Sequence, residues 1–190
     1  DVQMGKNGGA VLVAAGWSTE RDVLSLGIRV DNSEQLEEVI KLSANWSGQW
    51  WFSADKPLYK IRALADLSGY SVSNAQEDFG RKLTVTVKNG GSRLNALLAV
   101  TARSLLADGT ISDKDLLWGV YPSSNSNNTD GEVLSDFAHR LRTTVSRVRY
   151  AKRDEPLFIR HTPSAKRSKG AGGDRNDPTA QILSIHLNSY

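Results

Sequence analysis

The sequence predicts an α+β fold with a small mixed sheet and helices packed on one face of it. Short segments of strand-like alternation, clearest at residues 83–87, and segments of helical spacing between them lead to this prediction. A hydrophobic content of 39% over 190 residues is enough to bury a core. We expect three parts: an N-terminal extension (1–44), an α+β module (45–122) and a basic C-terminal extension (123–190).

The N-terminal extension is expected to contain two short strands and one helix. Residues 1–9 are polar and glycine-rich, which is typical of an arm, and strands are predicted at residues 10–15 and 23–30. A helix follows, because Asn32 or Ser33 can cap it and acidic residues fill its first turns. Three apolar side chains are predicted to share its inner face: Leu36, Val39 and Ile40.

The module begins with a predicted strand at residues 49–53 and a helix. Asp55 can cap this helix, Pro57 suits its first turn because a proline has no N–H to leave unpaired, and Gly69 suits the position that ends it. Tyr70 then begins a second strand. The apolar residues at helical spacing are Leu58, Ile61, Leu64, Ala65 and Leu67.

The second half of the module adds a strand at residues 83–87, a helix at residues 93–107 that Gly109 can end, and a strand within residues 116–121. The order over residues 49–121 is therefore β-α-β-β-α-β. The side chains predicted to face inward from the second helix are Leu94, Leu97, Leu98, Thr101, Ala102 and Leu105.

The C-terminal extension is predicted to contain one amphipathic helix and several short strands. The helix is expected at residues 132–142, with strands around residues 145–150 and 157–159 and a final strand at residues 182–187. Residues 164–178 are of low complexity and are expected to be mobile.

The module resembles the short N-terminal (N-zero) domain of secretins and TonB-dependent receptors, and its relatives in the DotD-type lipoproteins of type IVB secretion and conjugation systems. The stretch FSADKPLYKIRALADLSGYSV is similar to the first half of the family pattern, a strand followed by a leucine-rich helix that ends at glycine. The stretch KLTVTVKNGGSRLNALLAV is similar to the second half. The preceding Asn45-Trp46-Ser47-Gly48 is similar to the start of the DotD-type domains.

This resemblance implies a non-enzymatic, periplasmic or outer-membrane-associated module. It would assemble into rings, or dock other protein subunits, in a secretion, conjugation or pilus complex. A small sheet with open edges is compatible with such a role. The longest apolar run, residues 10–15, is too short to cross a membrane. A chain that begins at Asp1 fits either a processed precursor or a trimmed chain.

No catalytic or metal-binding constellation is present in the sequence. His139, His161 and His186 lack the spacing of metal ligands and are predicted to be surface or structural residues. The chain has no cysteine, which excludes disulfides and thiolate ligands. We therefore expect no catalytic residue, no metal and no cofactor.

Aromatic residues are the predicted interface positions of the module. Trp50 and Trp51 are neighbours in a predicted strand, so they point to opposite faces, and one of them faces away from the local core. Such a tryptophan is either covered by another part of the chain or used to bind a partner. The interface candidates are Trp46, Trp50, Trp51, Tyr70 and Trp118.

The basic residues suggest an alternative function. Residues 140–169 hold ten Lys or Arg against two acids, a local charge of +8 in a chain of net charge +3. Segment 139–169 could hold phosphates, as in a nucleic-acid-binding, nucleocapsid or coat protein of the virion or cytoplasm. It could equally be a solvated face or bind an acidic partner. The candidates are Arg140, Arg142, Arg147, Arg149, Lys152, Arg153, Lys166, Arg167 and Lys169.

Overall fold

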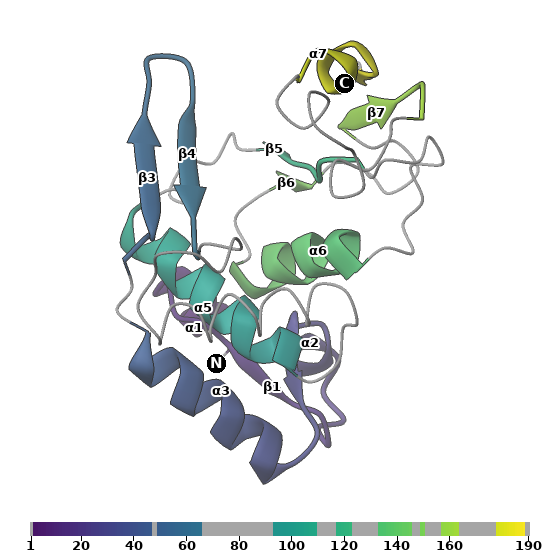
Figure 1. Cartoon of the computed structure of the whole chain (residues 1–190). Helices are drawn as coiled ribbons and strands as arrows, with labels where there is room; N and C mark the ends of the chain where they lie inside the picture. The colour runs from purple at the N-terminus through teal and green to yellow at the C-terminus, as the bar shows by residue number, and fades with distance from the viewer. Residues whose placement is uncertain are drawn as a thin grey trace.

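The computed structural model of the chain contains both helices and strands, which confirms the α+β class (Figure 1). Among the described residues the strands form four separate two-stranded sheets. The single small sheet that was predicted is therefore not present in this part of the chain. The structure describes residues 2–46, 49–65, 93–109, 117–122, 133–145, 149–150, 157–163 and 178–188.

The N-terminal segment forms α1 (Val2–Asn7), β1 (Val13–Ala15), α2 (Arg21–Leu24) and β2 (Ile28–Val30), with β1 and β2 parallel. The predicted arm is wrong, because α1 occupies it. Gly5 lets α1 lie close to Leu12, because a Cβ there would be 2.6 Å from the Leu12 side chain. Gly9, with φ of +71°, follows the end of α1, a position that favours glycine. The second predicted strand, at residues 23–30, is present only over β2, since α2 includes its first two residues.

Helix α3 (Ser33–Asn45) begins where the capping signal predicts. The Asn32 side chain accepts a hydrogen bond from the backbone N–H of Gln35 at 2.9 Å. Val39 is buried as predicted, but Ile40 is 56% exposed, so its predicted place on the inner face is wrong. One residue turns a helix by about 100°. The inner stripe therefore continues from Val39 to Leu42, which packs against the core.

Helix α5 (Arg93–Ala107) has the predicted bounds and lies between α3 and α6 (Val133–Val145) in Figure 1. Every residue from Leu94 to Ala102 is buried, including side chains that were not predicted to face inward. A helix that is apolar on most sides is one that neighbours surround. The core cluster also includes Ile28 of β2, Val39 of α3 and Leu141 of α6, so all three predicted parts of the chain supply it.

Helix α6 packs against the N-terminal segment at a glycine. A Cβ on Gly27 would lie 1.7 Å from the backbone oxygen of Arg140, so only glycine permits this approach. Leu141 is buried and Phe137 packs against the core, as the helical pattern predicts. Leu134, in the first turn of α6, is 42% exposed instead of inward, although it lies two turns before Leu141 on the same side of the helix.

Strands β3 (Phe52–Asp55) and β4 (Lys60–Ala63) form an antiparallel hairpin. The helix predicted from Pro57 is therefore wrong at these residues. Lys56 and Tyr59 close the turn by exchanging backbone hydrogen bonds of 2.9 and 3.3 Å. Pro57 is the second residue of this turn, where the fixed φ of proline suits a β-turn as well as it suits a first helical turn. The rest of the predicted helix beyond residue 65 and the strands at 70–72 and 83–87 lie outside the described residues.

The C-terminal part contributes short strands. Strand β5 (Leu117–Trp118), inside the predicted 116–121, pairs in parallel with β6 (Arg149–Tyr150). Strand β7 (Phe158–Arg160) pairs antiparallel with β8 (Ile185–Leu187). The predicted final strand is thus only half present, since α7 (Thr179–Leu183) precedes it.

Candidate functional site

The β3–β4 hairpin is amphipathic. Its register places Phe52, Ala54, Ile61 and Ala63 on one face and Ser53, Asp55, Lys60 and Arg62 on the other. Phe52 is 46% exposed and Ile61 is 45% exposed, so the two large apolar side chains of this face are half uncovered. We call these four residues, Phe52, Ala54, Ile61 and Ala63, the apolar hairpin face.

The opposite face is held at the base of the hairpin by charged groups. The Arg62 guanidinium donates hydrogen bonds to the Asp55 carboxylate and, at 3.3 Å, to the carboxylate of Asp108, which follows α5. Asp108 also accepts a 2.9 Å hydrogen bond from the Trp50 indole N–H. The hydrogen bond from Arg62 lowers the pKa of Asp55, and the one to Asp55 raises the pKa of Arg62. This network ties one side of the hairpin to the end of α5.

The turn of the hairpin forms a second feature, which we call the hairpin tip and define as residues 56–60. It reads Lys-Pro-Leu-Tyr-Lys, and all five residues are exposed. Leu58 is 95% exposed, and Tyr59 is also largely uncovered. In Figure 1 the hairpin projects away from the helices, with this turn at its far end. The tip was not predicted from the sequence, although a proline between two strand-prone runs is a turn signal.

The described tryptophans of the predicted interface have different surroundings. Trp46 packs against the core and donates a 3.2 Å hydrogen bond from its indole N–H to Ser104, and Trp118 also packs against the core. The Trp50 indole N–H donates a hydrogen bond to the Asp108 carboxylate. Trp51 is 42% exposed, with its ring centroid 6.3 Å from that of Phe52. Trp51 is therefore the tryptophan of this pair that faces outward, beside the apolar hairpin face. The fifth candidate, Tyr70, lies outside the described residues.

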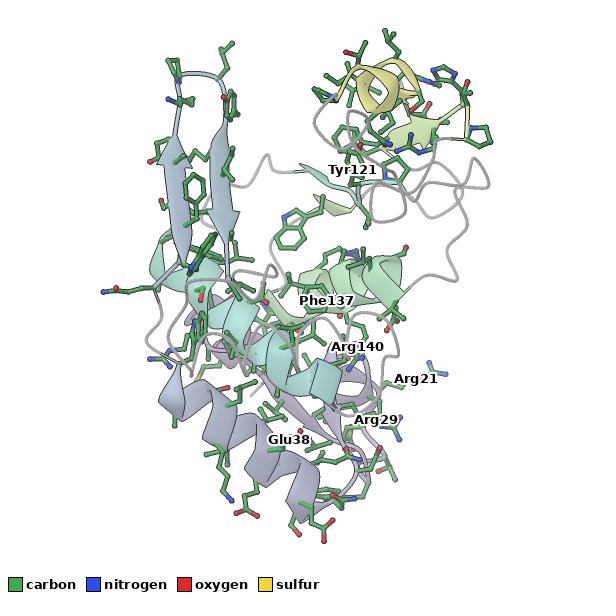
Figure 2. The ribbon with its side chains drawn as sticks, viewed as in Figure 1. Arg21, Arg29, Glu38, Tyr121, Phe137 and Arg140 are labelled. Atoms are coloured by element: carbon green, nitrogen blue, oxygen red, sulfur yellow. The ribbon has the colours of Figure 1, made fainter. Side chains whose placement is uncertain are left out.

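The structure describes only three of the predicted basic residues, and one of them, Arg140, joins parts of the fold. The Arg140 side chain, which Figure 2 labels, donates hydrogen bonds to the carbonyl of Gly27 at 2.8 Å and to the Asn95 side chain. It also forms an ion pair with Asp136, with an N···O distance of 3.6 Å. Arg142 is part of α6 and Arg149 of β6. The candidates outside the described residues are Arg147, Lys152, Arg153, Lys166, Arg167 and Lys169.

A further arginine is buried near the C-terminus. Arg160, which was not among the candidates, donates hydrogen bonds to Ser184 and, at 3.0 Å, to Gln181. Its guanidinium carbon lies 5.9 Å from the ring centroid of Tyr121, which Figure 2 labels. This arginine therefore joins β7 to α7 and to the segment after β5.

The structure brings two of the histidines together, which their spacing in the sequence did not reveal. His161, which directly follows β7, and His186 of β8 have ring centroids 5.4 Å apart. They share a face because His186 pairs with Ile159, two residues before His161. Within the described ranges, no three histidine, cysteine, aspartate or glutamate residues gather as a metal site would require.

Comparison of the chain with protein-family models, with curated proteins and with solved structures found no match. Across the described ranges, every helix is too short or too polar to cross a bilayer.

Proposed function

We propose that this protein is a non-enzymatic assembly module that docks to other protein subunits through the β3–β4 hairpin. The observation that supports this most is the apolar hairpin face, where Phe52 and Ile61 are each nearly half exposed. Exposed aromatic and branched apolar side chains that gather on one face are typical of protein interfaces. Trp51 beside them adds a residue type that is enriched at the energetic centres of interfaces.

The backbone of the hairpin offers a second means of docking. Within the part of the chain that the structure describes, β3 and β4 pair only with each other. Each strand therefore has one edge that a strand from another subunit could join. A contact that joins an edge of one subunit to a different surface of the next is the kind that builds rings.

We propose a second copy of this chain as the partner, in a cell-envelope secretion, conjugation or pilus complex at the periplasmic or outer-membrane side. The envelope setting rests on the resemblance of residues 52–72 and 82–100. The β-α-β-β-α-β order of that resemblance does not hold at β4, so self-association is the part of this proposal that the geometry supports best.

Sedimentation velocity over a concentration series tests the proposal. We expect the wild-type protein to shift from monomer to oligomer as its concentration rises. Replacing Phe52 and Ile61 together by serine should weaken the association about a hundredfold, since burying each side chain contributes about 1.5 kcal/mol. Ile40→Ser is the control, because Ile40 is 56% exposed, somewhat more than Phe52 and Ile61, but lies on α3.

Two results would contradict self-association through the hairpin. One is a wild-type protein that stays monomeric up to about 100 μM. The other is a double variant that associates as strongly as the wild type.

Nucleic-acid binding remains the alternative function, in a virion or the cytoplasm. It would be favoured if single-stranded RNA bound tightly at about 50 mM salt and lost affinity steeply as salt increased.

A further inference from the structure

We propose that the hairpin tip inserts into the interface of a lipid bilayer that carries anionic headgroups. This goes beyond self-association, which uses the apolar hairpin face, because the tip is a different surface with a different chemistry. The inference rests on the exposure of the tip, on its charge and on its shape.

The exposure of the tip is the first argument. Leu58 is 95% exposed, so almost nothing in the described structure covers it. Pro57 and Tyr59 flank it, which gives three consecutive residues with apolar bodies at the end of a projecting hairpin (Figure 1). An apolar residue with an adjacent tyrosine suits the boundary of a membrane, where the ring lies at headgroup depth and the aliphatic side chain reaches the acyl chains.

The charge of the tip is the second argument. Lys56 and Lys60 stand on either side of the apolar triplet, and both are exposed. The nearest acid, Asp55, is paired with Arg62, so the two charges of that pair cancel. The hairpin therefore has a net charge of +2, which comes from the two lysines beside the tip. Lysines in this position meet anionic headgroups while the residues between them enter the interface.

The shape of the tip favours a bilayer over a protein as its partner. A stable protein interface buries about 800 Å² on each side, which a turn of three apolar residues cannot supply. A protein would also need a pocket that matches a convex tip, whereas a bilayer adapts to any small convex insertion. Arg62 lies two residues, about 7 Å, behind Lys60 along β4, so a shallow insertion of the tip leaves Arg62 and Asp108 outside the membrane.

Co-sedimentation with vesicles is the first test. We expect the full chain to bind vesicles of phosphatidylcholine with about 30% phosphatidylserine and to bind pure phosphatidylcholine much more weakly. Replacing Leu58 by serine should weaken binding roughly tenfold, and each Lys→Gln change at positions 56 and 60 should weaken it roughly fivefold. Ile40→Ser and Lys41→Gln on α3 are the matched controls and should bind as the wild type does.

A fluorescent label reports insertion directly. The chain has no cysteine, so Leu58→Cys gives a single labelling site for an environment-sensitive dye. We expect the emission of the dye to shift to the blue when the anionic vesicles are added. The same dye at Ile40→Cys should not shift.

Three outcomes would overturn the proposal. They are wild-type protein that fails to bind the anionic vesicles, Leu58→Ser protein that binds as well as the wild type, and a dye at position 58 that stays in water on bound protein. Because the tip variants leave Phe52 and Ile61 in place, sedimentation without vesicles shows whether self-association persists. Failure of the membrane proposal can thus be told apart from failure of the proposed assembly.

Discussion

Helix α5 and the β3–β4 hairpin meet at Asp108, yet their apolar side chains have different surroundings. Residues 94–102 of α5 are buried, because α3, α6 and β2 all pack around this helix. The hairpin makes hydrogen bonds at its base, leaves Leu58 exposed and leaves Phe52 and Ile61 nearly half exposed. Apolar residues therefore stabilise the fold in one region and are available for binding in the other. The neighbours of a segment decide which role its apolar residues have.

The largest effect should come from truncating a core residue of α5. Replacing Leu98 by alanine should destabilise the protein by about 2–5 kcal/mol, since the side chain is fully buried and leaves a cavity. Replacing Leu58 by alanine should change stability by less than about 0.5 kcal/mol, because the side chain is already in water. Urea denaturation measures both. Similar losses for the two variants would show that the hairpin tip is covered in solution.

The second effect concerns Arg140, which joins α6 to Gly27 and to Asn95 of α5. Replacing it by methionine should cost about 2–3 kcal/mol, because the partly buried groups that it satisfies lose a charged donor. Arg142→Met is the matched control from the same helix and should be close to neutral. If Arg140→Met left stability unchanged but reduced RNA binding, Arg140 would belong to a nucleic-acid surface and not to the core.

The third effect concerns the attachment of the hairpin to α5. Replacing Asp108 by asparagine removes the charge that accepts hydrogen bonds from Trp50 and Arg62 and should cost about 1–2 kcal/mol. Amide hydrogen exchange should become faster in residues 52–63 and remain slow in residues 94–102. Equal acceleration in both regions would contradict the idea that Asp108 holds only the hairpin.

The smallest effect depends on pH. The hydrogen bond from Arg62 lowers the pKa of Asp55 in the folded protein, so the pair stabilises the hairpin above the ordinary pKa of an aspartate. This stabilisation should disappear as the pH falls through the lowered pKa. A carboxyl-carbon NMR titration measures it. In Arg62→Gln protein the pKa of Asp55 should return toward its usual value, and an unchanged titration would mean that Arg62 does not cause the shift.

The parts that sequence reasoning predicted well are those that local signals control. The bounds of α5 follow from a long apolar repeat and from Gly109, whose φ is +74°. The start of α3 follows from the Asn32 cap. In each case the interacting groups lie within four residues of one another, so the sequence displays them directly.

The candidate site, the β3–β4 hairpin, could not be predicted from local signals. Leu58, Ile61 and Leu64 have helical spacing, but the turn at Pro57 is compatible with a hairpin too, and the local pattern does not choose between them. Among the tryptophans, Trp46 is covered through contacts with α5, about 58 positions away, where Ser104 accepts its hydrogen bond. Only Trp51 of the predicted interface is exposed among the described residues.

The sequence by itself determined the α+β class, the Asn32 cap that starts α3, the bounds of α5, and the local excess of basic residues. These depend on composition and on hydrogen bonds between near neighbours. The tertiary structure decided which side chains are buried: it enclosed α5, used Arg140 to join α6 to Gly27 and left the hairpin face uncovered. Burial depends on segments that lie up to 113 residues apart, as Arg140 and Gly27 do, and no local pattern encodes that contact.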